Sequence, residues 1–355
     1  MPVWLDRGAL GCRLFAVEPR SNDKASSRHS GDNADWIELG LLNNMSDSAL
    51  EQTERQILRL LHDAAEGLSI RLRLYALPAV SRGEWGQKHL ARLHYYSAND
   101  LWNSNLDGLI ITGAEPRTED LTQEAYWHEL VETFDWANEN TISSVMSCLA
   151  VHAAVLHFDG IDRTSLEQKC FGLFEFEKVG NNPLLEGTQK RLLMPHSRLN
   201  EITERALVPC NYEILTKSEV AGVDTFVKKK RSLFVFFQGH PEYEPWTLLG
   251  EYRRDIGRYL SGERDTYPLM PQAYFDADST LALTEFRDRA IAKRQIELMT
   301  TFPTDRLVGT LKDHWHTDAV QLYHNWLQQL VARKSDRSRS VRASMIEAAS
   351  ERSGR

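Results

Sequence analysis

One cysteine of this chain lies where a protein can use sulfur as a nucleophile. Cys148 follows residues 142–147, which are predicted to form a strand, and it precedes small and apolar residues, 149–157, that predict a helix. A sulfur at such a turn lies at the helix N-terminus, where the helix dipole and free backbone N–H groups favour the thiolate. The remaining cysteines are far apart and form no CxxC pair, which argues against a zinc site or a disulfide framework and predicts buried apolar roles: Cys12, Cys170 and Cys210.

The same strand-to-helix turn can supply backbone donors for an oxyanion. The N–H of Leu149 directly follows the cysteine, and a second N–H could come from the turn at Gly113 and Ala114, which ends the apolar run 107–114. Gly113 has no side chain and would permit a close approach. We therefore expect an oxyanion hole for a tetrahedral intermediate at this place.

A histidine and a glutamate suited to proton transfer follow the strongly apolar run 232–237. His240 lies between Gly239 and Pro241, and Glu242 points the same way in an extended segment, where it could orient the imidazole. The order Cys, His, Glu fits a catalytic triad. On spacing alone, one cysteine and one His-x-Glu pair are also common as structural residues, so both interpretations stay open at this point.

These residues are separated by alternating strand and helix patterns. Further strands are predicted at 36–42 and 69–77, and helices at 48–65 and 124–139. Such alternation predicts an α/β fold with a doubly wound, mostly parallel sheet, and these sheets bind ligands at the carboxyl ends of their strands. Gly113, Cys148 and His240 all fall at such ends. A C-terminal helical elaboration is predicted at 245–260, 279–299 and 316–331.

The composition predicts one folded domain with polar ends. Residues 1–35 form a lead-in whose segment 18–35 is polar and turn-rich, so a loop is expected there. Residues 36–331 carry the periodic patterns and form one predicted domain. From residue 332 to 355 the chain is charged and poor in apolar residues, which predicts a loose tail.

The charge pattern excludes several classes of partner. The net charge of the 355 residues is −8, and Lys and Arg are scattered, so the chain lacks the basic stripe that binds nucleic acid. No apolar run approaches the roughly 20 residues that span a bilayer, and the N-terminus has no apolar stretch of signal-peptide length. We expect a cytoplasmic protein that acts on small molecules and associates with neither nucleic acid nor membrane.

A series of motifs resembles one known family. In order they are ILRLL at 57–61, DGLIITGA at 107–114, YW at 126–127, SCLAVHAA at 147–154, KCFG at 169–172, PHSR at 195–198, GHPEYE at 239–244, EYRRD at 251–255 and HNWL at 324–327. They resemble the homoserine O-succinyltransferase family, itself built on the flavodoxin-like fold of class I glutamine amidotransferases. The resemblance covers residues 36–331, and PHSR followed by GHPEYE is its most specific part.

The resemblance implies a role for each matched residue. It makes Cys148 the acyl-thioester nucleophile, His240 the general base and Glu242 its partner acid. It also implies that the substrate is bound by three further residues, of which the last holds the amino-acid carboxylate: Lys169, Ser197 and Arg254. The implied reaction moves a succinyl group, or less readily an acetyl group, from acyl-CoA to the hydroxyl of homoserine in methionine biosynthesis. Acyl-CoA is then a co-substrate, no metal or bound cofactor is required, and a homodimer is allowed.

Three departures from the family pattern affect substrate contacts. Residues 43–47 read NNMSD where the family usually has Met-Pro-Lys, and Leu149 and His152 stand where it commonly has Trp and Gln. Arg117 occupies a loop position that influences donor choice in the family. An arginine there could pair with the distal carboxylate of a succinyl group, or could simply face solvent in a polar loop.

Other functions fit parts of the pattern. A glutamine amidotransferase would need a glycine-rich GxCxG elbow, and the residues around Cys148 lack both glycines. A catalytically silent binding protein would have little reason to keep the complete set of Cys148, His240, Glu242 and Arg254. A related acyltransferase that uses serine or another hydroxy amino acid stays open, because the departures at 43–47 and Leu149 could alter the acceptor.

Overall fold

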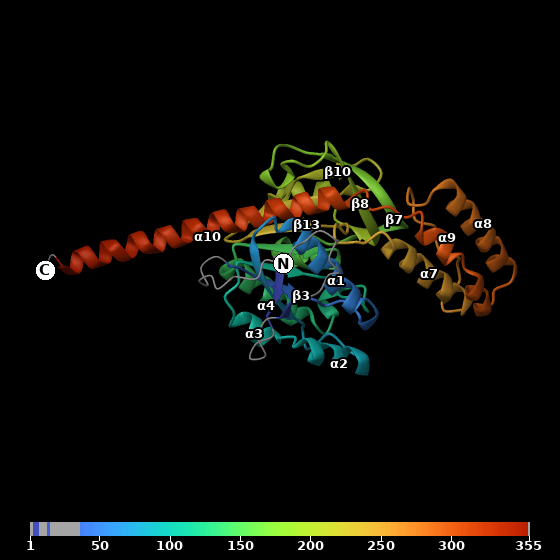
Figure 1. Cartoon of the computed structure of the whole chain (residues 1–355), viewed down its shortest axis with the longest axis horizontal. Coiled ribbons are helices and arrows are strands. Elements are labelled where there is room, and N and C mark those ends of the chain that lie inside the picture. The colour runs from blue at the N-terminus through green and yellow to red at the C-terminus, as the bar shows by residue number, and fades with distance from the viewer. Residues whose placement is uncertain (1–2, 7–12, 15–35, 354–355) are drawn as a thin grey trace.

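The computed structural model describes residues 3–6, 13–14 and 36–353 of the chain, and the whole segment 18–35 that was expected to form a loop lies outside them. Figure 1 shows a layered α/β body, with helices α7, α8 and α9 at one end and the long helix α10 running out at the other. Among the described residues, no helix is both long and apolar enough to cross a membrane.

The described residues form a central sheet of nine strands, and its middle is parallel. From edge to edge the order is β2-β1-β4-β3-β5-β6-β13-β12-β9. The pairs from β1 to β13 are parallel, whereas β2, β12 and β9 add to the two edges in antiparallel fashion. The strands are β1 Val3–Leu5, β2 Arg13–Leu14, β3 Trp36–Leu42, β4 Ser69–Tyr75, β5 Gly108–Ile111, β6 Ser143–Ser147, β9 Glu213–Ile214, β12 Thr225–Lys229 and β13 Leu233–Phe237.

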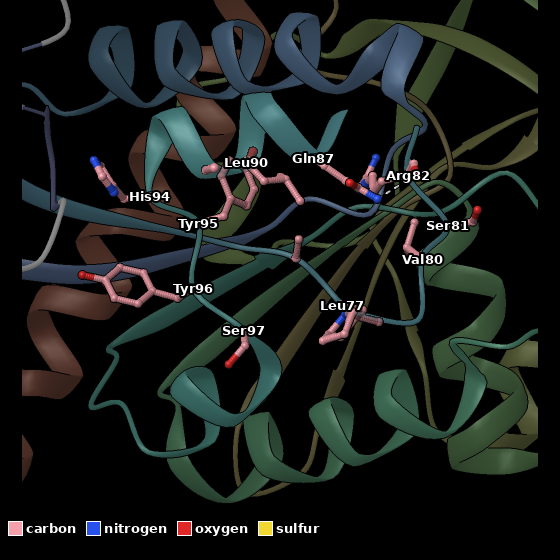
Figure 2. Close-up of a pocket in the computed structure, with 13 residues that line it drawn as sticks. Leu77, Val80, Ser81, Arg82, Gln87, Leu90, His94, Tyr95, Tyr96 and Ser97 are labelled. Atoms are coloured by element: carbon pink, nitrogen blue, oxygen red, sulfur yellow. Dashed lines mark hydrogen bonds between the residues drawn. The ribbon is translucent and has the colours of Figure 1, made fainter. Parts of the chain in front are cut away.

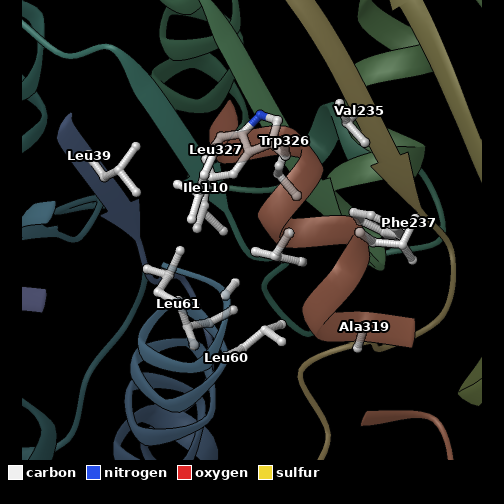
Figure 3. Packing of buried hydrophobic residues seen from close by; sticks show 14 of the residues in the cluster. Leu39, Leu60, Leu61, Ile110, Val235, Phe237, Ala319, Trp326 and Leu327 are labelled. Atoms are coloured by element: carbon white, nitrogen blue, oxygen red, sulfur yellow. The ribbon is translucent and has the colours of Figure 1, made fainter. Parts of the chain in front are cut away.

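Helices cover both faces of this sheet, because both faces of its central strands are apolar. On one face α1 (Asp47–Ala64) and the first half of α10 (His316–Ser353) pack on the strands through one buried cluster, with Leu61 and Leu327 fully buried (Figure 3). On the other face α4 (Trp127–Asn140) and α5 (Leu149–Asp159) bury a second cluster. The predicted doubly wound, mostly parallel α/β sheet is therefore confirmed.

A second, antiparallel sheet was not predicted from the sequence. It has the order β11-β10-β7-β8 and is dominated by the long hairpin of β7 and β8, in which Phe171 lies opposite Ser197. Residue 165 pairs with 200 and residue 170 with 198, so a bulge interrupts the register between them. The strands are β7 Thr164–Lys178, β8 Arg191–Glu201, β10 Thr216–Ser218 and β11 Gly222–Val223.

The expected C-terminal helices are present, with changed bounds. Helix α7 spans Thr247–Leu260 and packs with α8, Ala277–Ala292, around a third apolar cluster that includes Phe286 and Trp315. The helical pattern predicted to reach residue 299 stops at Ala292, and a 3₁₀ turn follows at Ile296–Thr301 before the short α9, Thr304–Val308. Two further short helices, α2 Glu84–Leu93 and α3 Ala98–Trp102, follow β4.

The end of the chain differs from the expected loose tail. The composition predicts a helix that stops at residue 331, but α10 continues to Ser353. Residues 332–353 contain neither Gly nor Pro and are rich in Ala, Arg, Ser and Glu, so nothing in them breaks a helix even though they lack an apolar stripe. Near residue 332 the helix is still anchored, because Lys334 Nζ donates to Trp36 O at 2.7 Å and to Asp107 Oδ2 at 2.6 Å.

Candidate active site

The turn at Cys148 has the backbone of a nucleophile elbow. Cys148 precedes the first residue of α5 and has φ 52° and ψ −113°, a conformation that a residue with a side chain adopts only under strain. Its N–H donates to Phe237 O at 2.9 Å, which ties the turn to the end of β13. The elbow therefore presents the sulfur at the carboxyl edge of the sheet, as the sequence predicts.

Gly113 lies directly against the start of α5. A Cβ placed on Gly113 would lie 3.0 Å from Leu149 N and 2.4 Å from Leu149 Cβ, so only glycine leaves room for this approach. The first N–H groups of a helix have no partner within the helix and are free to bind an anion. The structure thus brings the predicted oxyanion residues Leu149 and Gly113 together, with the neighbouring Ala114 buried beside them.

His240 and Glu242 form a buried pair beside the sulfur. His240 Nδ1 lies 2.9 Å from Glu242 Oε1, and both side chains are buried. Burial by itself disfavours a charged imidazole, but the charges and hydrogen bonds of Cys148 and Glu242 outweigh it and raise the pKa of His240 well above its ordinary value. A histidine held between a cysteine and a carboxylate is the arrangement of an activated cysteine nucleophile.

The backbone before His240 is fixed by a second buried pair. Asp224 Oδ1 accepts a hydrogen bond from the Gly239 N–H at 2.8 Å and lies 3.3 Å from His196 Nε2. His240 N–H donates to Pro195 O at 2.9 Å. The residues of the PHSR and GHPEYE motifs therefore meet in space, and they hold His240 to the edge of the second sheet.

The three residues expected to bind substrate lie in one charged cluster. Ser197 Oγ donates to Glu251 Oε2, and Lys169 Nζ lies 3.7 Å from Glu251 Oε2 and 3.5 Å from Asp255 Oδ2. Arg254 donates to Asp255 Oδ1 from both Nε and Nη2, at 3.2 Å each, while its side chain remains 47% exposed. Strands β7 and β8 contribute Lys169 and Ser197, and α7 contributes the other members.

A tyrosine connects this cluster to the triad. The ring of Tyr243 stacks on His240 with centroids 4.1 Å apart, and its hydroxyl donates to Glu251 Oε1 at 2.6 Å. Sequence reasoning missed Tyr243, Glu251 and Asp255 as site residues. The signal was present, because all three belong to the GHPEYE and EYRRD motifs.

Comparison with known proteins agrees with this arrangement. The chain matches the model of the homoserine O-succinyltransferase family over residues 22–337. It is 47% identical over 296 residues to a homoserine O-succinyltransferase of Rhodopseudomonas palustris, covering 83% of this chain and 89% of the relative. The homoserine O-succinyltransferase of Bradyrhizobium japonicum is 44% identical over 322 residues, 89% of this chain and 98% of the relative. The chain belongs to the homoserine O-succinyltransferase family.

The resemblance found in the motifs is therefore confirmed for this member of the homoserine O-succinyltransferase family. Among solved structures, a glutamine amidotransferase from Methylobacillus flagellatus is 13% identical and covers 83% of this chain and 95% of its own, with a TM-score of 0.46.

The structure places Arg117 away from the buried residues of the homoserine O-succinyltransferase site. Arg117 is exposed, and the contact that fixes it is made by its backbone, whose N–H donates to Glu124 Oε1 at 2.6 Å. The segment 43–47 lies at the same strand edge, where Asn44 N–H donates to Thr112 Oγ1 at 2.9 Å. Its two asparagines are buried, so this departure from the family pattern changes the strand ends themselves.

An open cavity of about 820 Å³ lies at the end of β4. Figure 2 shows its lining side chains coming from the loop after β4 on one side and from α2 and residues 94–97 on the other. None of the predicted site residues lines it. Three strand spacings separate β4 from β6, so the cavity lies roughly 14 Å along the sheet edge from Cys148. The described residues contain no group of three or more His, Cys, Asp and Glu side chains that could hold a metal ion.

Proposed function

We propose that this protein transfers a succinyl group from succinyl-CoA to the hydroxyl of L-homoserine through a thioester on Cys148. The product, an O-succinyl-homoserine, would feed methionine biosynthesis in the cytoplasm. The observation that carries the proposal is the half-buried Cys148 at a strained elbow, with the buried pair of His240 and Glu242 beside it and Gly113 packed against Leu149. Family membership and the names of the relatives support homoserine and succinyl as the substrates.

In the first half-reaction the Cys148 sulfur attacks the thioester carbonyl of the donor. The new C–S bond creates an oxyanion, which the N–H of Leu149 and an N–H of the Gly113–Ala114 turn stabilise. Collapse of this intermediate breaks the bond between the acyl carbon and the CoA sulfur, and His240 gives its proton to the departing thiolate. The enzyme is left as a succinyl thioester with a neutral imidazole.

In the second half-reaction the acceptor hydroxyl replaces CoA. The neutral His240 takes the hydroxyl proton, the oxygen attacks the thioester carbonyl, and the bond to the Cys148 sulfur breaks. The thiolate returns, again paired with the imidazolium. Glu242 holds the ring through Nδ1 in both halves, so that the other ring nitrogen faces the reacting atoms.

The charged cluster next to Tyr243 suits an amino-acid acceptor. A free amino acid carries an ammonium and a carboxylate, and the cluster presents both signs of charge through Lys169 and Arg254 on one side and Glu251 and Asp255 on the other. The half-exposed guanidinium of Arg254 can take a carboxylate in a bidentate manner. Tyr243 places this cluster beside His240, which is where the acceptor hydroxyl must be deprotonated.

Mass spectrometry of the protein mixed with succinyl-CoA and no acceptor tests the thioester. We expect a succinyl adduct on Cys148 in the wild type, no adduct in Cys148→Ala, and an unchanged adduct in the matched control Cys210→Ala. An adduct that persists in Cys148→Ala would refute the assignment. Release of CoA measured with homoserine and with serine, each against succinyl-CoA and acetyl-CoA, then decides the acceptor and the donor.

A further inference from the structure

Three of the buried polar atoms that have no hydrogen-bond partner in the described structure lie outside the Cys148, His240 and Glu242 arrangement and influence one another electrostatically. They are Tyr126 Oη, His152 Nδ1 and Arg163 Nη1. Tyr126 is 7% exposed and His152 only 4%, so bulk water does not satisfy them. Leaving a buried donor or acceptor unpaired costs about 1–3 kcal/mol, and folded proteins contain few such groups. Their occurrence together calls for a ligand or a specific role.

The three side chains come from different elements but belong to one electrostatic group. Tyr126 precedes α4, His152 lies one turn into α5, and Arg163 lies between α5 and β7. The charge of Arg163 acts on both Tyr126 and His152. Arg163 Nη2 donates to Glu119 O at 2.8 Å, which leaves Nη1 unused.

This group carries a net positive charge with spare donors. Burial, followed by the charges of Arg163 and Arg198, lowers the pKa of His152 to about 3, so its imidazole is neutral. Burial likewise raises the pKa of Tyr126, whose hydroxyl stays protonated. Among the described residues no ion pair involves Arg163. The Glu124 carboxylate, whose charge acts on Tyr126, accepts the N–H groups of residues 117 and 118 and makes no salt bridge with Arg163 among the described residues.

The position of the group relative to the sulfur indicates the anion that it would bind. Cys148 immediately precedes α5 and His152 is the fourth residue of that helix, so both belong to its N-terminal end. An acyl group on Cys148 therefore starts at the end of α5 that carries His152, whose ring is coupled to Arg163. In a succinyl thioester two methylene groups separate the carbonyl carbon from the distal carboxylate, whereas an acetyl thioester ends at its methyl group.

We propose that Arg163 and Tyr126, beside the neutral ring of His152, bind the distal carboxylate of the succinyl group and so select the donor. This inference rests on the proposed function and names the residues that recognise the distal end of the acyl chain. A guanidinium with a free N–H and a protonated phenol are both donors, and a carboxylate accepts from both. Arg117, the residue that the sequence suggests for this role, is exposed and lies outside this group.

Donor selection is tested by the second-order rate of Cys148 acylation, measured with succinyl-CoA and with acetyl-CoA in the absence of any acceptor. For Arg163→Gln we expect the succinyl rate to fall about 10- to 150-fold, while the acetyl rate changes by less than about twofold. Arg163→Lys should restore part of the succinyl rate. Arg191→Gln, an exposed arginine paired with Glu177 far along β8, is the matched control and should leave both rates unchanged.

Tyr126→Phe separates ligand binding from a structural role. The hydroxyl has no partner in the free protein, so its removal should leave Tm unchanged or raise it, while the succinyl rate falls about 2- to 10-fold. If the three atoms instead share a structural water, Tyr126→Phe would lower Tm and leave donor preference intact, and the inference would be wrong.

Further outcomes also overturn the inference, and they differ from a failure of the proposed function. Equal loss with both donors, or a loss confined to transfer onto homoserine, would show that Arg163 does not read the succinyl carboxylate. A succinyl-selective loss in Arg117→Ala but not in Arg163→Gln would assign that role to Arg117. Failure of the proposed function would already be visible in the wild type, as the absence of any acyl adduct on Cys148.

Discussion

Replacing Gly113 by alanine tests the oxyanion hole with a single methyl group. The backbone of Gly113 lies outside the left-handed region, so alanine can adopt it without strain. The added Cβ, however, would lie 2.4 Å from Leu149 Cβ and 3.0 Å from both Leu149 Cα and N. The contact involves backbone atoms at the start of α5, so the helix start or the turn must move.

The size of the effect follows from what must move. A shift of a few tenths of an ångström carries the Leu149 N–H away from the position of the oxyanion, and losing one such donor lowers kcat about 10²- to 10³-fold. Both half-reactions pass through a tetrahedral intermediate, so both should slow. The overlap itself should also reduce the free energy of unfolding by about 1–3 kcal/mol.

Single-turnover acylation of Cys148 and steady-state release of CoA measure the two effects on rate, and a denaturant titration measures stability. Gly257→Ala is the control, because this α7 glycine has no atom within 4 Å of the added Cβ. It should keep full activity and gain about 0.5–1 kcal/mol from replacing a helical glycine. If Gly113→Ala acylates within threefold of the wild-type rate, the turn after β5 does not form the oxyanion hole.

Three further predictions concern other parts of the molecule. The charge of Glu242 helps to raise the pKa of His240 against the effect of burial, so Glu242→Gln should lower that pKa. The alkaline limb of the plot of acylation rate against pH should then move to lower pH. An unmoved limb would remove Glu242 from the triad. Arg254→Lys should raise the KM for homoserine about tenfold and leave acylation by succinyl-CoA intact, and equal damage to both would place Arg254 elsewhere. Leu327→Ala should lower the free energy of unfolding in a urea titration by about 2–5 kcal/mol, because Leu327 is fully buried. The exposed Leu281→Ala should lower it by less than about 0.5 kcal/mol, and equal losses would contradict the packing of α10.

The central sheet was predictable because its strands are buried on both faces. Runs such as 36–42 and 232–237 are apolar nearly throughout, and few structures other than a covered parallel strand suit them. The first of these runs coincides with β3, and the predicted helix at 48–65 differs from α1 by one residue at each end. The two strands at the N-terminal edge, β1 and β2, are too short for any periodicity to show.

The second sheet was hidden because its long strands alternate irregularly. The first half of β7 is largely exposed and only its later residues are buried, so no steady period of two exists over its 15 residues. The bulge between residues 165 and 170 shifts the register as well. A pairing between β7 and β8 depends on residues 14 to 37 positions apart, which local pattern reasoning does not detect.

The same difference between local and long-range patterns explains which site residues could be predicted from the sequence. Cys148, Gly113 and His240 follow predictable strands of one sheet, so topology alone brought them to one edge. Lys169 and Ser197 lie on the second sheet, and their roles depended on the family resemblance. Tyr126 and His152 are visible in the sequence only as a motif residue and as a departure from the family pattern, and Arg163 has no sequence signal. What distinguishes the three is the absence of a partner for one polar atom of each in the folded structure.

The three structural parts of the site match the three tasks of the proposed reaction. The parallel sheet holds the elbow and the oxyanion donors, which must not move while charge develops on the carbonyl oxygen. The antiparallel hairpin and α7 hold the acceptor cluster, and Tyr243 joins that cluster to His240, the one residue that must serve CoA and homoserine in turn. The donor residues Tyr126, before α4, and Arg163, after α5, have no hydrogen bond to the acceptor cluster among the described contacts. Because the two sets are built on different elements, this chain could change its acyl donor through residues 126, 152 and 163 and keep its acceptor unchanged.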